Sequence, residues 1–258
     1  MSLSREQMLV EMGISPIWVV REKGGEPAPA VAPAPQSAGE APPSAVVAVP
    51  QPAPLRESVA GPAAAVDAMN WPELTRAVAE CKACPLCQQR KQAVLGVGDL
   101  NPDWLFIGEG PGADEDVQGE PFVGQAGKLL DNMLASLDIS RGNKVYIGNA
   151  VKCRPPGNRT PEAAEMAACR PYLERQIALL KPKIIVLLGK AAVHSVLHDD
   201  KSLASLRGKR FEYAGIPVVV TYHPAYLLRN LPDKSKAWED LLFARRLLNA
   251  LATPELPF

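Results

Sequence analysis

The sequence has no apolar run of about 18 residues or more, so no membrane-spanning helix is expected. It also lacks a basic start followed by an apolar run, so we expect no secretory signal and a cytoplasmic location, close to the nucleoid in a prokaryote. The formal net charge is zero, so composition alone does not indicate nucleic-acid binding, although a local basic face would suffice for it. With 258 residues, 47% of them hydrophobic, the chain can bury one sizeable core but not two large ones.

Cysteine is scarce and its count is odd: Cys81, Cys84, Cys87, Cys153 and Cys169. In a reducing compartment, such cysteines are metal ligands or free thiols more often than disulfides. One close pair and two distant cysteines can bring four thiolates to one inorganic centre, as iron–sulfur clusters require. Structural zinc usually takes two close pairs, so the spacing favours a cluster over zinc or unligated thiols. It leaves open which of the first three cysteines is spare.

Composition divides the chain into three parts. Residues 24–69 are rich in Pro and Ala and hold few large apolar side chains, which predicts a disordered, partly polyproline linker. Residues 1–23 contain a short apolar segment, which fits a docking peptide and an extra helix packed on the core equally well. Residues 70–258 have the pattern of an ordered domain.

Apolar, β-branched runs alternate with helical spacing across the predicted domain. The expected strands are 104–107, 145–147, 184–188 and 218–222. The expected helices are 129–137, 162–180, 191–197 and 237–251, and Thr160 and Pro161 are expected to begin the second one. This alternation predicts an α/β domain with a parallel sheet, in which ligands bind at the carboxyl ends of the strands.

A glycine-bearing loop, GEGPGADEDVQGEPFVGQAG, follows the first expected strand at 108–127. Its glycines let the backbone approach a ligand closely. The Walker phosphate-loop signature is absent, and acidic residues such as Glu109 and Glu115 would repel a triphosphate. The loop therefore suits a neutral ligand, such as a base removed from its phosphates, and a plain turn is the other interpretation.

Two further strand ends carry side chains suited to a nucleobase. Asn149 offers an acceptor and a donor that match N3–H and O4 of uracil, although a turn-forming asparagine fits the sequence as well. Lys152, Arg154 and Arg159 follow it and can hold phosphates. His223 can donate a hydrogen bond to a departing anionic base, although a lone histidine is more often structural.

Taken together, four segments resemble the family 4 uracil-DNA glycosylases, which are thermophile-type enzymes with a [4Fe-4S] cluster. The segments are CKACPL at 81–86, GEGPGADEDVQGEPFVGQAGKLL at 108–130, NAVKCRPPGNRTP at 149–161 and HPAYLLRN at 223–230. The resemblance spans about residues 74–250. It implies a three-layer αβα sandwich with a four-stranded parallel sheet. It also implies a monomer that removes uracil from single- or double-stranded DNA by hydrolysing the N-glycosidic bond, with free uracil and an abasic site as products.

The resemblance also implies a ligand set for the cluster. The family's ligands fall on Cys81, Cys84, Cys153 and Cys169, which leaves Cys87 as the spare cysteine. A related branch that crosslinks to uracil-DNA carries a histidine where Cys153 stands, followed by a basic insertion. Neither feature is present here, so the resemblance implies turnover and not crosslinking.

Individual roles follow from the same motifs. The family's uracil-stacking phenylalanine falls on Phe122, its base-reading asparagine on Asn149 and its second-motif histidine on His223. Glu109 and Gly110 occupy the first catalytic motif, where Glu109 would orient water or His223. Related glycosylases of the classical family have an aspartate where Gly110 stands, so the resemblance leaves open which residue activates water here. The implied substrate-binding residues are Gly108, Gly110, Phe122, Asn149 and Glu115, the last placed near C5 of the base, where it would disfavour thymine.

The predicted DNA contacts are Arg154, Arg159, Tyr226, Leu227, Leu228 and Arg229. Residues 226–228 are expected on a loop, where they either wedge into the base stack or simply pack. A catalytically silent DNA-binding module of the same fold and a zinc-stapled nucleotide hydrolase are the alternative functions. Residues 8–22 faintly resemble the N-terminal peptide of the psi subunit of a clamp loader, and ELPF at 255–258 resembles a clamp-docking tail, which would make the replication clamp or clamp loader a partner.

Overall fold

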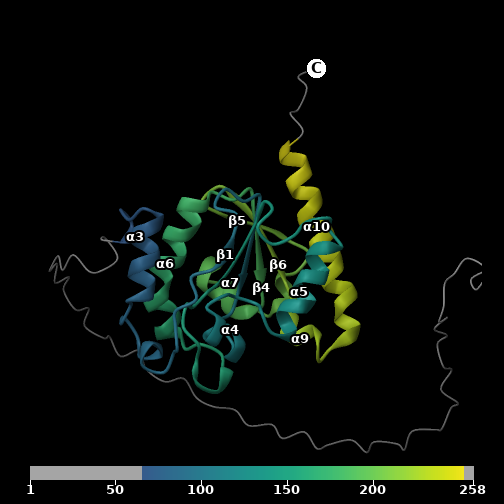
Figure 1. The fold of residues 1–258 in the computed structure, drawn as a ribbon. Coiled ribbons are helices and arrows are strands. Elements are labelled where there is room, and N and C mark those ends of the chain that lie inside the picture. The colour runs from purple at the N-terminus through teal and green to yellow at the C-terminus, as the bar shows by residue number, and fades with distance from the viewer. Residues whose placement is uncertain (1–65, 253–258) are drawn as a thin grey trace, which may run out of the picture. The chain divides into compact units, whose positions relative to one another are not determined.

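The computed structural model describes residues 66–252 (Figure 1). The predicted segment 1–23, almost all of the predicted linker 24–69 and the tail 255–258 lie outside the described residues. Within the described range, none of the helices combines the length and the hydropathy that crossing a bilayer requires.

Six strands form one mixed sheet in the order β1-β3-β2-β4-β6-β5. The four central strands are parallel and match the predicted ones: β3 (Val145–Asn149), β2 (Trp104–Gly108), β4 (Ile184–Leu188) and β6 (Ile216–Thr221). Two antiparallel strands, β1 (Val97–Gly98) and β5 (Arg210–Tyr213), extend the sheet at its edges. The predicted four-stranded parallel sheet is therefore the centre of a wider mixed sheet. The edge strands escaped prediction because β1 has two residues and β5 is not deeply buried, so neither forms an apolar run.

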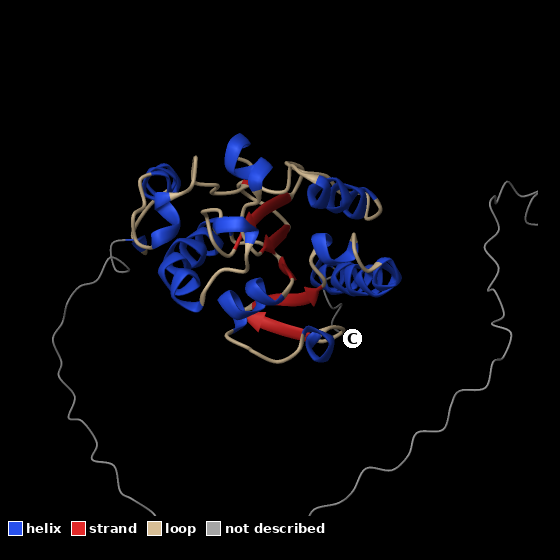
Figure 2. Ribbon diagram, turned by 90° about the horizontal axis from the view of Figure 1, so that it is seen from below, coloured by secondary structure: helices blue, strands red, loops and turns tan. Residues whose placement is uncertain are grey.

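Helices cover both faces of the sheet and make three layers (Figure 2). On one face, α6 (Ala163–Leu180) and α7 (Lys190–Leu197) bury their apolar sides, and α3 (Trp71–Ala79) packs against α6. On the other face, α5 (Gln125–Ala135) and α10 (Lys234–Ala252) pack on the strands. The central strands are buried on both sides, which is why they read as continuous apolar runs in the sequence.

The four predicted helices are confirmed with shifted ends, and the start of α6 is corrected. Its N-cap is Glu162 and not Thr160. The Glu165 carboxylate accepts the Glu162 N–H at 2.8 Å and also binds Arg159, so the chain stays extended at Arg159 and turns into the helix after Glu162. The remaining short elements are α4 (Ala113–Gln118), α8 (Leu203–Leu206), α9 (Pro224–Leu227), η1 (Pro85–Gln88), η2 (Pro156–Asn158) and η3 (Leu231–Asp233).

A buried ion pair anchors α10 to the segment before β5, and its loss should destabilise the fold. Arg207 Nε lies 2.6 Å from Asp240 Oδ2, and the two side chains are only 12% and 2% exposed. Asp240→Ala leaves the Arg207 cation buried without its partner, so we expect it to lower the free energy of unfolding by about 3–5 kcal/mol. Urea denaturation followed by circular dichroism measures this loss.

Lys183→Met is the matched control, because it removes the exposed pair between Lys183 and Asp103, whose atoms lie 2.9 Å apart. Exposed ion pairs contribute less than about 1 kcal/mol to stability, so the urea midpoint of Lys183→Met should stay close to that of the wild type. Equal losses in both variants would contradict the special role of the Arg207–Asp240 pair.

Candidate active site

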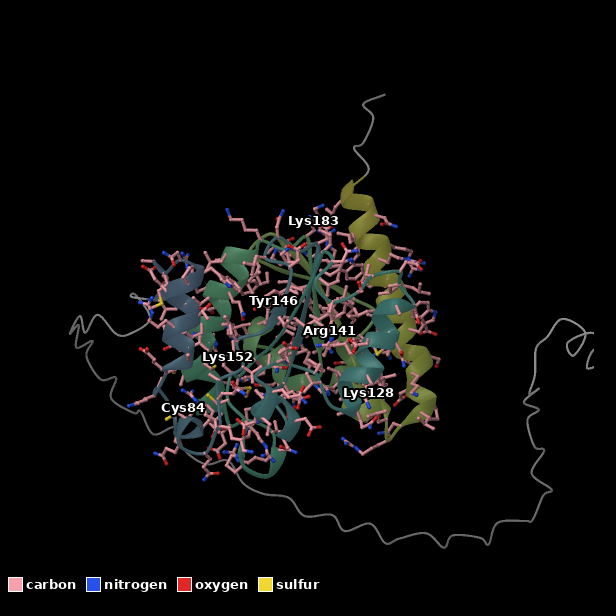
Figure 3. All side chains as sticks on the ribbon, viewed as in Figure 1. Cys84, Lys128, Arg141, Tyr146, Lys152 and Lys183 are labelled. Carbon is pink, nitrogen blue, oxygen red and sulfur yellow. The ribbon has the colours of Figure 1, made fainter. Side chains whose placement is uncertain are left out.

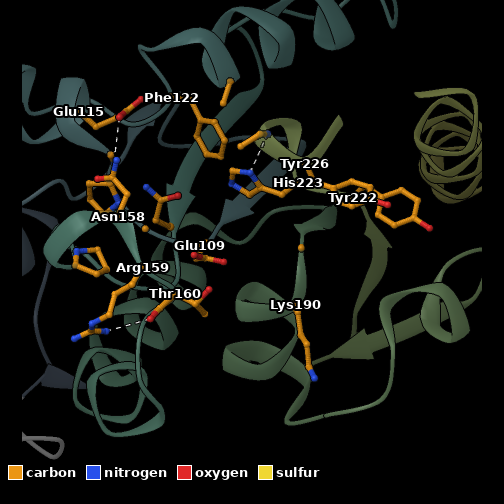
Figure 4. A pocket seen from close by; sticks show the side chains of 18 of the residues that line it. Glu109, Glu115, Phe122, Asn158, Arg159, Thr160, Lys190, Tyr222, His223 and Tyr226 are labelled. Carbon is orange, nitrogen blue, oxygen red and sulfur yellow. Dashed lines mark hydrogen bonds between the residues drawn. The ribbon is translucent and has the colours of Figure 1, made fainter. Parts of the chain in front are cut away.

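A cavity of about 770 Å³ opens at the carboxyl ends of the parallel strands (Figure 4). This is the edge at which α/β sheets place ligands. The predicted residues on its wall are Glu109, Gly110, Glu115, Phe122, Asn149, Arg159, His223, Tyr226 and Arg229. The fold therefore brings together loops that are more than a hundred residues apart in the sequence.

Asn149 ends β3 directly beside Gly108, which ends β2. The asparagine is 2% exposed, and its Oδ1 finds no hydrogen-bond partner among the described residues. A Cβ atom on Gly108 would lie 2.5 Å from Asn149 Oδ1 and 2.5 Å from Phe122 Cζ. Only glycine fits at position 108, because any side chain would push the amide and the phenyl ring out of place. An unpaired buried acceptor is costly, so Asn149 is built to receive a donor from outside the protein.

Phe122 and His223 form an aromatic wall of the cavity. Their ring centroids are 5.4 Å apart and their planes differ by 28° (Figure 4). Phe122 is 6% exposed and has a φ of 56°, a left-handed backbone conformation that bulky residues rarely adopt. Such strain persists only where neighbouring groups hold it, and it is common at functional sites.

His223 is the N-cap of α9 and is held as a neutral imidazole. Its Nδ1 accepts the Ala225 N–H at 3.2 Å, so the ring proton of the neutral form sits on Nε2. The pKa of His223 is lowered to about 4, mainly by burial and also by the Arg229 cation, while Glu115 opposes the shift. The site therefore presents a hydrogen-bond donor without a positive charge.

Two carboxylates from the glycine-bearing loop have different surroundings. Burial raises the pKa of Glu109, and a hydrogen bond with the Thr160 side chain opposes the rise. Glu115 lines the cavity, but both of its oxygens accept backbone N–H groups: Gly112 at 3.0 Å, Val123 at 2.9 Å and Gly124 at 3.1 Å. Glu115 thus fixes the loop around Phe122.

The predicted DNA-wedging loop is instead helix α9, and this changes the roles its residues can take. Leu227 is 1% exposed, and α9 packs on α5, so the prediction of Leu227 as a DNA contact is wrong. Leu228 is 42% exposed, and Arg229 is exposed at the cavity mouth. Tyr226 stacks on Tyr222 with centroids 5.0 Å apart, and its hydroxyl donates to Asp233 at 2.7 Å.

The predicted phosphate-binding cluster after β3 is also partly internal. Lys152 is 2% exposed and donates to the Asn149 carbonyl at 2.8 Å and to Gln176 Oε1 at 2.6 Å, so it cannot reach phosphate. Arg159 forms two hydrogen bonds with Glu165, at 2.7 and 2.8 Å. Arg154 donates to Asn158 Oδ1 at 2.7 Å on the surface.

The four predicted ligand cysteines, Cys81, Cys84, Cys153 and Cys169, line one small cavity, and Cys87 is not part of its wall. The Arg90 guanidinium donates to Cys153 Sγ at 2.9 Å, and the Lys152 N–H donates to Cys169 Sγ at 3.3 Å. Such donors suit thiolates. No three metal-binding side chains in the described residues converge as closely as a single ion requires. Four cysteine sulfurs on one cavity wall are a donor set that a [4Fe-4S] cluster takes, and structural zinc can take the same set.

Comparison with known proteins identifies the family. The model of the uracil DNA glycosylase superfamily matches residues 95–242. The chain belongs to this superfamily. A type-4 uracil-DNA glycosylase of Pyrobaculum aerophilum is 42% identical over 181 residues, which are 67% of this chain and 92% of that protein. A type-4 uracil-DNA glycosylase of Thermotoga maritima is 46% identical over 155 residues, which are 59% of this chain and 80% of that protein.

Within the superfamily, the predicted resemblance to family 4 is confirmed. A type-5 uracil-DNA glycosylase of Pyrobaculum aerophilum is 32% identical over 146 residues, which are 50% of this chain and 64% of that protein. The type-4 protein of the same organism is 42% identical over a longer stretch. The chain is therefore grouped with the type-4 glycosylases.

The site of this superfamily member also contains residues that the sequence did not single out. Gly189 and Lys190 follow β4 and line the cavity, and Tyr222 and Thr160 lie on its wall. Gly189 has a φ of 90° and packs against His223, because a Cβ there would lie 3.1 Å from His223 Cβ. The signal available in the sequence was a glycine directly after an expected strand, as at Gly108.

The charge state of His223 is open to direct measurement. We expect an NMR titration of labelled protein to show a midpoint near pH 4, because the ring is buried beside Arg229. Arg229→Ala removes the nearby cation and should raise the midpoint.

The lowered pKa also makes stability depend on pH. A histidine in the unfolded chain has a pKa of about 6.5, so between about pH 4 and pH 6.5 the unfolded chain binds a proton that the folded site does not. The contribution of this site to stability is therefore present above about pH 6.5 and is lost as the pH falls toward 4. A midpoint near 6.5 in the folded protein would contradict the assigned neutral state.

Proposed function

We propose that this protein removes uracil from DNA by hydrolysing the N-glycosidic bond, which leaves free uracil and an abasic site. The observation that carries the proposal is the unpaired Asn149 Oδ1, buried beside Phe122 and His223 in a cavity at the carboxyl end of the sheet. The names of the similar type-4 proteins support the same activity.

Base recognition rests on Asn149 and Phe122. Uracil stacked in a duplex is out of reach, so it must first be flipped into the cavity at a cost of a few kcal/mol. The Asn149 Oδ1 then accepts N3–H of uracil, and its amide N–H donates to O4. Cytosine has an acceptor at N3, so it would leave this oxygen unpaired. The Phe122 ring supplies the stacking surface that replaces the base stack.

Bond cleavage rests on His223 and Glu109. As the bond breaks, negative charge develops on the base and positive charge on the sugar. The neutral His223 donates from Nε2 to uracil O2, which stabilises the departing anion without first transferring a proton. The Glu109 carboxylate orients water toward the sugar and balances its positive charge. Gly110, which stands where another branch has an aspartate, supplies no base of its own.

The four cysteines that share a cavity are proposed to hold a [4Fe-4S] cluster. Such a cluster would tie the segment before β1 to the loop after β3, through Cys153, and to α6, through Cys169, by bonds that packing alone does not provide. Arg90 and Lys152 would neutralise part of its negative charge. Its role in this proposal is structural.

Uracil release from a single-uracil duplex tests the function, with a thymine duplex as the substrate control. Wild-type protein should release uracil with multiple turnovers. His223→Ala removes one donor to the leaving group, so we expect the single-turnover rate constant to fall about 10²- to 10³-fold while the affinity for DNA stays close to that of the wild type. Single-turnover kinetics and DNA-binding titrations measure the two quantities.

Two results would contradict parts of this proposal. Full activity in His223→Ala would remove His223 from the chemistry. DNA binding without uracil release from protein with a full cluster would favour a catalytically silent module. A denaturing gel of that reaction would show whether a covalent adduct had formed instead.

Single cysteine substitutions test the ligand set. Cys87→Ser should purify as brown protein with iron and sulfide contents equal to the wild type, because Cys87 lies outside the shared cavity. Cys84→Ser removes a proposed ligand and should lose most of the visible absorbance and some thermal stability. Metal analysis provides the measurement. Stoichiometric zinc and no sulfide would overturn the cluster proposal.

A further inference from the structure

The segment 121–124, which presents Phe122 to the cavity, is held from two sides by charged side chains. On one side, Glu115 accepts the N–H groups of Val123 and Gly124. On the other side, Arg141 donates to the carbonyl oxygens of Pro121 and Phe122, the first at 2.8 Å. The left-handed backbone of Phe122 therefore has its neighbouring donors and acceptors satisfied on both sides.

Arg141 is itself fixed in place. Its Nε lies 2.5 Å from Asp131 Oδ1 on α5, and its side chain is 24% exposed. Its three donor nitrogens thus bind three different acceptors in a fork that lysine cannot reproduce. In Figure 3, Lys183, which directly precedes β4, lies at the top of the view, and Arg141 lies lower down.

This segment fits closely against the first turn of α5. A Cβ atom on Gly127 would lie 1.7 Å from the Phe122 carbonyl oxygen, so the helix approaches the strained residue as closely as glycine permits. The same carbonyl oxygen is the one that Arg141 binds. The ring of Phe122 meanwhile packs between Gly108 and His223.

From these contacts we infer that Arg141 is a positioning residue for the base-stacking ring. It is absent from the cavity wall and touches no group proposed to react. It acts by pinning the Phe122 carbonyl, which holds the phenyl ring parallel to the plane that a flipped base would occupy. This inference rests on the proposed function only for the identity of the ligand that stacks on Phe122. Loss of Arg141 should weaken uracil binding and leave the chemical step largely intact.

The test combines Arg141→Met with Phe122→Ala in a double-mutant cycle. Stacking of a base on an aromatic ring contributes about 1–3 kcal/mol, so we expect Arg141→Met to raise KM and the inhibition constant of free uracil by roughly 5- to 100-fold. The single-turnover rate at saturating DNA should change much less. In the Phe122→Ala background, Arg141→Met should have no further effect, because the ring through which it acts is gone.

Lys183→Met is the matched control, since it removes an exposed cation that pairs with Asp103 far from the cavity. It should leave the inhibition constant of uracil unchanged. Should Arg141→Met not fold, Arg141→Lys carries the test, because it keeps the charge but cannot bind three acceptors at once. Unchanged uracil inhibition in the substituted protein, or effects that add to those of Phe122→Ala, would overturn the inference.

A second readout separates this inference from the proposed function. Amide hydrogen exchange of Val123 and Gly124 should speed up in Arg141→Met and not in Lys183→Met, whatever the ligand of the cavity is. Wild-type protein that releases no uracil would overturn the proposed function alone. Unchanged exchange at both amides in Arg141→Met would overturn the inference that Arg141 holds this segment in place.

Discussion

The parallel pairing that sets Gly108 beside Asn149 is the constraint on which the rest of the site depends. Because β2 and β3 end at the same level, the absence of a side chain at 108 opens a space that the Asn149 amide and the Phe122 ring share. In this space, the Asn149 amide oxygen has no hydrogen-bond partner among the described residues, and the Phe122 ring is confined against His223. The strained backbone of Phe122 is then the consequence of bringing a ring from the loop after α4 into that space.

The same strand end joins the cavity to the cysteine site. Asn149 and Cys153 are four residues apart, and Lys152 between them donates to the Asn149 carbonyl and, through its main chain, to Cys169 Sγ. No carboxylate pairs with Lys152 among the described residues, and a buried ammonium without a counter-charge is costly. Thiolates of the proposed cluster would supply that charge. The cluster would then stabilise the lysine that holds the base-reading residue, which gives a structural centre an effect on recognition.

Sequence reasoning succeeded where a residue type leaves a local signal. The four central strands are continuous apolar runs, and the strand-end residues Asn149 and His223 do line one cavity. It failed where tertiary contacts decide. Nothing local distinguishes Leu227, which is buried, from Leu228, which is exposed, because only the packing of α9 against α5 separates them. The sequence predicts Lys152 as a surface cation, and only the structure shows that it is buried and bound to internal acceptors. Arg141 left no signal, since it works through main-chain carbonyls that are 19 and 20 residues away.

The distribution of charge around the cavity fits the chemistry that the proposal assigns to it. DNA brings negative phosphates to the rim, where Lys190 and Arg229 are exposed, while the interior holds Glu109 and Glu115. An acidic interior repels phosphate and admits a neutral base, so the charge pattern itself favours a flipped nucleobase over the backbone.

The two carboxylates of the interior have different roles. Both oxygens of Glu115 accept backbone N–H groups, so Glu109 is the carboxylate able to face the developing positive charge of the sugar. In the proposed reaction, the departing base meets a neutral His223, whose ring proton is held on Nε2 because Nδ1 accepts the Ala225 N–H. Burial and the nearby Arg229 cation disfavour a positive charge on this ring. Stabilisation of the leaving group therefore depends on hydrogen-bond geometry and not on ion pairing.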